Sequence, residues 1–208
     1  MTLNQPTLLV ATHNPAKLKR YQKQLADLQV NLVSLADIDV QIEPPEEIGQ
    51  NTLEIVKNKV KFYFEKTQKP CFSSDSGLYF EGVSESEQPG KNVKGIAGAK
   101  DNMSDEEIFE KMIDFYSKLA TKYGGQLNGY FLDSYCLFDG QNHYSQEVKR
   151  PIVLTNKIHK KDIHFPICSL YTVGGKYYHD LSEAEMADFL APSMAGLKKV
   201  IFDWLENS

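Results

Sequence analysis

The chain has 208 residues and a formal net charge of −5, a balance that argues against a general nucleic-acid-binding protein. Its 41% hydrophobic and 25% charged residues are typical of a soluble globular protein, large enough for one domain or for two lobes that share a core. No apolar run approaches the roughly 20 residues that span a bilayer, and the N-terminus lacks the pattern of an export signal. We expect a cytoplasmic protein with reduced, buried thiols, because its cysteines lie in apolar runs without metal-ligand spacing: Cys71, Cys136 and Cys168.

The first predicted element is a buried strand over residues 7–11, which runs into a helix. Asn14 is a good N-cap, Pro15 suits the first helical position, and an apolar stripe follows at Leu18, Tyr21, Leu25 and Leu28. A strand that opens directly into a helix presents unpaired amides and a positive dipole end, which together favour phosphate binding. Lys17 gains nothing from that dipole, so it is either a solvated lysine or a residue kept for a ligand.

A second strand is predicted over residues 31–35, followed by an acidic connection and a helix. The helix is expected to begin at Asn51 or Thr52, and Glu54 is placed to complete a capping box.

Two charged features accompany this second helix. Lys59 falls inside the apolar arc of the helix, where a charge must snorkel to solvent, pair with an acid or contact a ligand. The pair Glu46-Glu47 lies just before the helix and is either a metal ligand or a solvated loop.

The stretch Ser73–Leu78 lies between two short β-like runs, residues 71–72 and 78–80. We expect Asp75 to lie where a strand leaves the sheet, with Gly77 supplying a tight backbone. A carboxylate at a strand end, flanked by hydroxyl residues, can hold a divalent cation or act as a general base. The alternative is a plain Asp-Ser-Gly turn that closes a hairpin.

The middle of the chain reads as a flexible loop over residues 81–92, which contains Pro89-Gly90, and then a helix. Ser104 and Glu107 form the capping box of this helix, Gly124-Gly125 ends it, and its buried stripe is Ile108, Met112, Phe115 and Leu119.

The final third is predicted to be mostly β-structure, with one hairpin over residues 127–138 and 144–154. A second hairpin, 167–173 and 176–181, flanks Gly174-Gly175. A short helix over 182–190 should be broken by Pro192, and a last helix should follow with the stripe Met194, Leu197, Ile201 and Leu205. We find no internal repeat and no domain linker.

Four short motifs follow one another along the first half of the chain. The first is a Thr-x-Asn-x-x-Lys turn made by Thr12, Asn14 and Lys17. The second is a Glu-x-Gly stretch with the helix after it, carried by Glu47, Gly49, Glu54 and Lys59. The third is Ser74-Asp75-Ser76-Gly77-Leu78, and the fourth is the Pro89-Gly90 loop followed by Lys94. Together these motifs resemble the inosine triphosphate pyrophosphatase family, whose third motif reads Asp-Asp-Ser-Gly-Leu.

The resemblance implies an α/β fold in which helices flank an elongated mixed β-sheet, with two lobes, a central cleft and residues 1–208 as one domain. It implies hydrolysis of a nucleoside triphosphate to monophosphate and pyrophosphate with Mg²⁺, or possible use of Mn²⁺. It also suggests a homodimer. From charge and hydropathy we expect neither a nucleic acid nor a membrane as partner of this cytoplasmic protein.

The resemblance also implies roles for individual residues. The expected catalytic residues are Lys17, Lys59 and Asp75, and the expected metal ligands are Glu47 and Asp75. The expected substrate-binding residues are Thr12, Asn14, Lys17, Lys59, Ser74, Ser76 and Lys94. This chemistry suits the reaction, because phosphoanhydride hydrolysis needs cations to neutralise phosphate oxygens and a carboxylate to activate water. Whether Asp75 ligates metal, orients water or does both is left open.

The chain departs from the family pattern at three places. Ser74 stands where the third motif has its first Asp. The resemblance implies that two C-terminal segments hold the nucleobase, a Phe-Gly-Tyr-Asp-Pro-like stretch and a Ser-His-Arg triplet. Here Ile163–Ile167 resembles the first without its Asp, and residues 187–197, where the second is expected, have neither its His nor its Arg. The base preference is therefore open and need not be inosine or xanthosine. The alternative function is a catalytically impaired nucleotide-binding protein of the same fold.

Overall fold

The computed structural model describes residues 5–12, 15–38 and 42–207. The strands in this part of the chain are β1 (Thr7–Val10), β2 (Asn31–Ser34), β3 (Cys71–Phe80), β4 (Gln126–Phe138), β5 (His143–Thr155), β6 (Tyr171–Val173) and β7 (Lys176–Tyr177). The α-helices are α1 (Pro15–Gln24), α2 (Thr52–Thr67), α3 (Asp105–Lys122) and α4 (Glu183–Leu205). Five 3₁₀ turns connect them: Leu35–Asp37, Glu85–Glu87, Gly95–Ala97, Pro166–Ser169 and Tyr178–Asp180.

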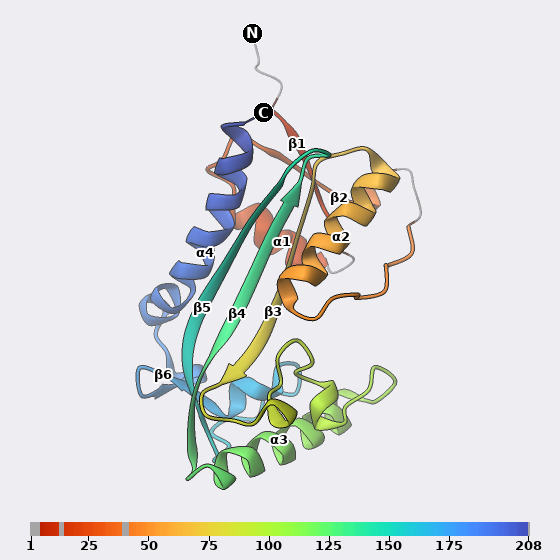
Figure 1. Ribbon diagram of the computed structural model, residues 1–208. Helices are drawn as coiled ribbons and strands as arrows, with labels where there is room; N and C mark the ends of the chain where they lie inside the picture. The colour runs from red at the N-terminus through yellow and green to blue at the C-terminus, as the bar shows by residue number, and fades with distance from the viewer. Residues whose placement is uncertain (1–4, 13–14, 39–41, 208) are drawn as a thin grey trace. The chain divides into compact units, whose positions relative to one another are not determined.

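The strands form a single mixed sheet in the order β2-β1-β3-β4-β5-β6-β7. Figure 1 shows the neighbouring strands β3, β4 and β5 side by side. β1 pairs in parallel with both β2 and β3, whereas β6 pairs antiparallel with β5 and β7. The predicted α/β class with a mixed sheet and flanking helices is therefore confirmed. None of the helices in the described residues has the length and apolar character needed to cross a membrane.

The chain divides into two compact units. The first comprises Met1–Asp75, Asp133–Val148 and Ser193–Ser208, and the second comprises Ser76–Leu132 and Lys149–Pro192. Three strands (β3, β4 and β5) and the helix α4 contribute residues to both units. The expectation of one domain over the whole chain stays a prediction.

In the first unit, helices cover both faces of the sheet. α2 packs on one face through Val56, Val60 and Tyr63, in a cluster with Leu9, Cys71 and Cys136. α1 and the C-terminal part of α4 pack on the other face, in a cluster that includes Tyr21, Leu25, Phe72, Leu197 and Ile201. The predicted helices are thus amphipathic as expected, although α1 ends at Gln24, before two buried members of its stripe, Leu25 and Leu28.

The start of α2 carries half of the predicted capping box. Asn51 is the N-cap, and its side-chain oxygen accepts a hydrogen bond of 2.9 Å from the backbone N–H of Glu54. The Glu54 carboxylate returns to the backbone N–H of Gln50, at 2.8 Å, and not to that of Asn51. Two backbone amides at the start of the helix are thus hydrogen-bonded to side chains: that of Glu54 inside the first turn and that of Gln50 just before the N-cap.

In the second unit, α3 packs on the sheet as predicted. Ser104 and Glu107 form the expected capping box, and Ile108, Met112 and Leu119 are buried in a cluster with Leu78 and Leu154. The β4–β5 hairpin, whose strands contribute residues to both units, is also confirmed, and its strands match the predicted ranges to within one residue at each end.

The stretch around Asp75 is not a turn. β3 runs without a break from Cys71 to Phe80, so both the strand end and the closing hairpin turn predicted there are wrong. Gly77 serves close approach and not a bend: a Cβ at this position would lie 2.9 Å from the carbonyl oxygen of Gly90, which accepts a 2.8 Å hydrogen bond from Leu78 N–H. The small residues let the following loop return against an extended strand.

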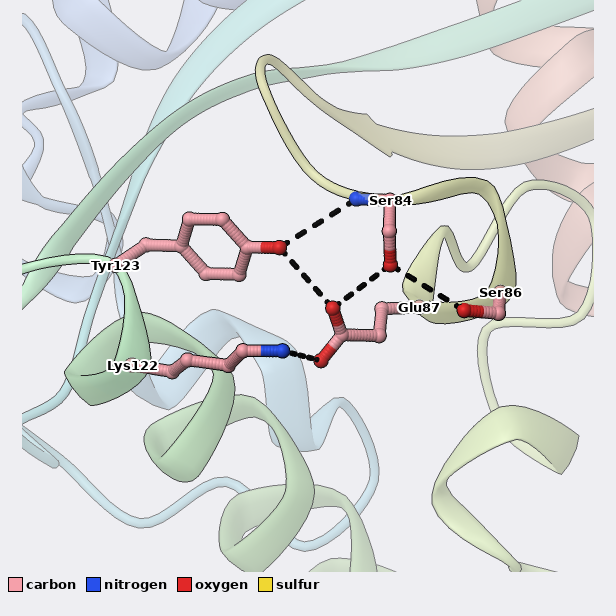
Figure 2. Close-up of polar contacts among 5 residues, drawn as sticks. All are labelled: Ser84, Ser86, Glu87, Lys122 and Tyr123. Atoms are coloured by element: carbon pink, nitrogen blue, oxygen red, sulfur yellow. Dashed lines mark hydrogen bonds and ion pairs between the residues drawn. The ribbon is translucent and has the colours of Figure 1, made fainter.

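The loop over residues 81–92, expected to be flexible, is held by side chains. The Gln88 side-chain amide bonds both the N–H and the C=O of Phe80, at 2.6 and 2.8 Å. The Glu87 carboxylate accepts hydrogen bonds from Lys122 (2.6 Å), Ser84 (2.8 Å) and Tyr123 (3.0 Å), as Figure 2 shows. These contacts tie the loop to the end of β3 and to the C-terminal end of α3.

The C-terminal elements differ from the prediction in two ways. The second hairpin turns at Gly174-Gly175 as expected, but its strands are short, since 3₁₀ turns occupy Pro166–Ser169 and Tyr178–Asp180. Pro192 lies inside α4 and does not end it. A proline in a helix interior removes one backbone hydrogen bond, and here buried side chains hold the helix on either side of it, Phe189 in the second unit and Leu197 in the first.

The three cysteines are free thiols, as predicted. Burial raises the pKa of Cys71 and of Cys136 to about 12 each, and that of the half-buried Cys168 to about 11. Such thiols stay protonated near neutral pH and are poor nucleophiles.

Candidate anion-binding site

The candidate site lies in the first unit, where β1 ends and β3 continues. Leu9 and Val10 pair with Cys71 and Phe72, so residues after Val10 face the part of β3 that begins at Ser73. Ligand sites in α/β proteins form beyond the carboxyl ends of parallel strands. The end of the parallel pairing at Val10 and Phe72, and not a strand end at Asp75, therefore marks the candidate site.

A small pocket of about 10 Å³ occupies this position. Its lining contains two apolar residues, four residues with hydroxyl groups and two lysines: Val10, Ala11, Thr12, Ser73, Ser74, Tyr21, Lys17 and Lys59. A space of this size holds one water-sized group, for example a single oxygen atom of an anion. Because hydroxyls and ammonium groups can all donate hydrogen bonds, the lining suits a phosphate oxygen.

Lys59 reaches this pocket from the apolar face of α2. Its side chain is 25% exposed, and its Nζ lies 3.7 Å from Oε1 of Glu47, whose side chain is 63% exposed. Of the three possibilities for this lysine, the structure therefore shows pairing with an acid, at a position that also borders the pocket. Glu47 is not simply part of a solvated loop.

The segment that carries Glu47 is fixed to α2 by two contacts. Asn58 donates a 2.8 Å hydrogen bond to the carbonyl of Ile48. Gly49 has a φ of +154°, and a Cβ there would lie 2.8 Å from the backbone nitrogen of Ile55, so a side chain at this position would push the segment away. Gly49 therefore lets the segment lie close to the start of the helix.

Tyr21 is a member of the pocket that the sequence did not reveal. It is only 2% exposed, and its ring meets that of Phe72 edge-on at 5.2 Å. Its hydroxyl is hydrogen-bonded to the hydroxyl of Ser74 and accepts a 3.3 Å hydrogen bond from Nη2 of Arg20. A tyrosine in an apolar stripe predicts only core packing, and the one available signal was its polar tip.

The remaining predicted residues fall into three groups. Asp75 is half-buried in the first unit, and strand alternation places it on the face of β3 that carries Cys71 and α2, opposite to Ser74. Asn14 lies outside the described residues. Ser76 and Lys94 belong to the second unit, where both are exposed. The structure therefore gathers Thr12, Lys17, Lys59 and Ser74 around one pocket, with Glu47 on Lys59.

The carboxylates near the pocket could bind Mg²⁺ together with the phosphates of a nucleotide, but in the part of the chain that the structure describes they do not form a metal site made of protein side chains alone. Among the described residues there is no group of three or more His, Cys, Asp or Glu side chains arranged to hold a metal. Mg²⁺ is commonly bound by one or two carboxylates together with the phosphates of a nucleotide, and not by an all-protein cage. Glu47 and Asp75 can supply carboxylates for that first mode.

A larger cavity, of about 630 Å³, lies wholly in the second unit. Its walls are mainly apolar, including Ile152, Val153 and Phe189, and its acidic side chains are Glu81, Glu185 and Asp188. Its one cation, Lys176, is paired with Glu185, whose pKa that contact lowers to about 2. This lining repels phosphate, so size alone does not identify the anion site.

These features define a class: an α/β protein with a small pocket, lined by ammonium and hydroxyl groups, at the carboxyl end of a parallel strand pair. Residues 8–147 match the model of the Ham1 family, and the chain belongs to that family. It is 29% identical over 106 residues to the dITP/XTP pyrophosphatase of Mannheimia succiniciproducens, a match that covers 51% of this chain and 51% of that relative. The chain thus spans about half the length of this relative. The family predicted from the four motifs is confirmed.

Solved structures of Ham1-type proteins share the fold. The HAM1 protein of Coxiella burnetii is 18% identical, with a TM-score of 0.74 and coverage of 95% of this chain and 99% of that one. The Ham1 protein of Staphylococcus aureus is 17% identical, with a TM-score of 0.71 and coverage of 97% and 98%. A nucleoside-triphosphatase, dITP/XTP pyrophosphatase, of Mycobacterium abscessus is 19% identical, with a TM-score of 0.69 and coverage of 91% and 95%. At these identities the likeness concerns the fold.

Proposed function

We propose that this protein hydrolyses a nucleoside triphosphate to the monophosphate and pyrophosphate. The observation that carries the proposal is the pocket in which Lys17 and Lys59 meet the hydroxyl residues Thr12, Ser73 and Ser74 at the end of β1. Membership of the Ham1 family supports it, as do the names of a relative and of a structural neighbour, both dITP/XTP pyrophosphatases.

In this proposal the phosphates are held by donors of two kinds. Lys17 and Lys59 share the negative charge of the phosphate oxygens, and they continue to do so as charge moves onto the leaving pyrophosphate. Thr12 and Ser74 add neutral donors from the pocket, and Asn14 is proposed to add another. Ser76 and Lys94 are proposed to contribute further contacts to the substrate.

The carboxylates have the complementary role. Asp75 is the proposed general base, accepting a proton from the attacking water. Glu47 and Asp75 are also the proposed ligands of Mg²⁺, or of Mn²⁺, which when bound neutralises phosphate oxygens. The Glu47–Lys59 pair keeps one carboxylate beside one ammonium group at the pocket, so that each can turn to an oppositely charged partner when the nucleotide binds.

The base preference, the assembly and the location of the protein belong to the same proposal. We infer a purine nucleotide whose base is selected loosely, a homodimer and a cytoplasmic enzyme. The family resemblance supports the last two.

The test is a panel of nucleoside triphosphates, assayed with Mg²⁺ and separately with Mn²⁺ for both pyrophosphate and orthophosphate. Release of pyrophosphate with an equal amount of monophosphate is the expected result. Release of orthophosphate alone would replace this reaction with a different phosphohydrolase activity.

A second function stays open because Ser74 provides no carboxylate at the start of the third motif. It is a nucleotide-binding protein that has lost turnover. Tight binding of a non-hydrolysable triphosphate analogue without pyrophosphate release from any member of the panel would favour this alternative.

A further inference from the structure

Three consecutive hydrogen-bonding groups lead from the surface of α1 to the anion pocket. Arg20 is exposed, Tyr21 is buried and Ser74 is half-buried. The Arg20 guanidinium donates to the Tyr21 hydroxyl at 3.3 Å and lies 5.2 Å from the centre of the same ring. The Tyr21 hydroxyl is in turn hydrogen-bonded to the Ser74 hydroxyl, which borders the pocket.

The chemistry of the first group fixes the direction of this chain of bonds. A guanidinium can only donate, so the Tyr21 oxygen accepts at that end. The Tyr21 proton then needs an acceptor of its own, because a buried hydroxyl that leaves its proton unpaired is costly. Among the described residues, the Ser74 oxygen is the acceptor within hydrogen-bonding distance of this hydroxyl.

Ser74 is therefore left with its own proton to donate. Its oxygen is engaged by Tyr21, while its hydroxyl borders a pocket that Lys17 and Lys59 make favourable for anions. Hydrogen bonds in such a chain polarise one another, so each donation strengthens the next. The final donor in this chain is the Ser74 hydroxyl, and the nearest suitable acceptor would be an anion oxygen.

We propose that Arg20, Tyr21 and Ser74 form a directed hydrogen-bond relay that presents the Ser74 proton to a phosphate oxygen in this pocket. The inference rests on the proposed function, because it takes the anion to be a phosphate group of the substrate. Ser74 touches the anion, whereas Tyr21 and Arg20 are positioning residues that act through Ser74. The relay gives a neutral donor at position 74 a fixed direction.

The test is calorimetric titration with inorganic pyrophosphate at a fixed Mg²⁺ concentration. Tyr21→Phe removes only the hydroxyl and keeps the ring against Phe72, and Ser74→Ala removes the final donor. Each variant should bind pyrophosphate about 3- to 10-fold more weakly, the scale of one neutral hydrogen bond. The double variant should bind no more weakly than Ser74→Ala alone, because Tyr21 acts only through Ser74.

Tyr135→Phe is the matched control. Tyr135 is a second buried tyrosine of the first unit whose hydroxyl is bonded to a serine, Ser193, and it does not border the pocket. It should bind pyrophosphate like the wild type, so any general effect of deleting a buried tyrosine hydroxyl is removed from the comparison. Arg20→Met, made on the exposed surface, tests the same relay if Tyr21→Phe does not fold, and it should weaken binding in the wild type but not in Ser74→Ala.

The outcomes separate the relay from the proposed function. If the wild type binds no pyrophosphate, the phosphate site itself is wrong and the relay fails with it. If the wild type binds and Lys59→Met loses affinity, the phosphate site stands. In that case wild-type affinity of Tyr21→Phe, or effects of Tyr21→Phe and Ser74→Ala that simply multiply in the double variant, would overturn the relay alone.

Discussion

The ammonium group of Lys59 lies 3.7 Å from the carboxylate of Glu47, at the border of the pocket that also contains Lys17. Because the Glu47 side chain is 63% exposed, this ion pair contributes about 1 kcal/mol or less to the free energy of unfolding. Its value lies in position: it keeps a cation from the apolar face of α2 next to the end of β1. Removal of the Lys59 charge should therefore affect anion affinity much more than the free energy of unfolding.

Lys59→Met keeps the packing of the aliphatic stem and deletes the charge. We expect little change in thermal stability, because the lost pair is partly exposed. Pyrophosphate affinity should fall by about 10- to 100-fold, the scale of one charge-assisted hydrogen bond. Lys61→Met is the control, since Lys61 is exposed on the same helix and does not border the pocket. Wild-type affinity and kinetics in Lys59→Met would make Lys59 a purely structural residue.

Asp75→Asn tests the proposed general base. Its turnover should fall by roughly 10²-fold or more, as expected when a general base is lost, while thermal unfolding stays close to that of the wild type. Asp101→Asn, at an exposed position in the second unit that does not line the pocket, controls for the change of charge. A well-folded Asp75→Asn protein with unchanged turnover would remove Asp75 from the mechanism.

Local signals predicted the elements whose structure is decided locally. The capping box of Ser104 and Glu107 identified the start of α3, and two β-like runs on either side of a turn at residues 139–142 identified β4 and β5. Local signals failed where contacts with residues distant in the sequence determine the backbone conformation. The Asp-Ser-Gly sequence is typical of turns, but the carbonyl of Gly90 pairs with Leu78 and keeps β3 extended.

The candidate site follows the same division. The family resemblance predicted that Lys17 and Lys59 act on the same phosphates, and the structure places both at one pocket. Tyr21 was missed because its partner Ser74 is 53 positions away, and helical periodicity says nothing about the tip of a buried side chain. The pairing of Glu47 with Lys59 is likewise tertiary, although both residues were singled out.

The contacts of Glu87 predict local stabilisation of the loop over residues 81–92 (Figure 2). Glu87→Gln should weaken the bonds to Lys122, Ser84 and Tyr123 and speed hydrogen exchange of the amides of residues 84–88 at neutral pH. Glu85→Gln, at an exposed position two residues earlier in the same 3₁₀ turn, should leave exchange unchanged. Equal exchange rates in the two variants would show that the Glu87 carboxylate does not stabilise the loop.

The same contacts set the sign of a pH effect. The hydrogen bond from Lys122, and then those from Ser84 and Tyr123, lower the pKa of Glu87 below its ordinary 4.5. A carboxyl group with a lowered pKa in the folded state stabilises that state fully above its unfolded pKa, and the effect is lost as pH falls through the folded value. Carboxyl titration by NMR should give a midpoint below 4.5 in the wild type, and Lys122→Met should raise it.

The last prediction concerns selection of the base. Discrimination between a 6-keto and a 6-amino purine is large only when the wrong base leaves buried donors of the protein unpaired. The resemblance assigns base contacts to residues 187–197, which lie in α4. Ser193 is the only side-chain hydrogen-bond donor in that range, and its hydroxyl is already bonded to that of Tyr135. Asp188 is exposed and, when ionised, can only accept.

We therefore expect kcat/KM for inosine triphosphate to lie within about 10-fold of the values for adenosine and guanosine triphosphates, a difference of roughly 1.4 kcal/mol or less in transition-state free energy. Tyr135→Phe releases Ser193 from its partner and serves as a probe: if Ser193 can be recruited to the base, this variant should shift the ratio. A preference of about 10²-fold for inosine or xanthosine triphosphate in the wild type would contradict the prediction. It would mean that backbone amides, or His164 and its neighbours, supply the donors that residues 187–197 lack.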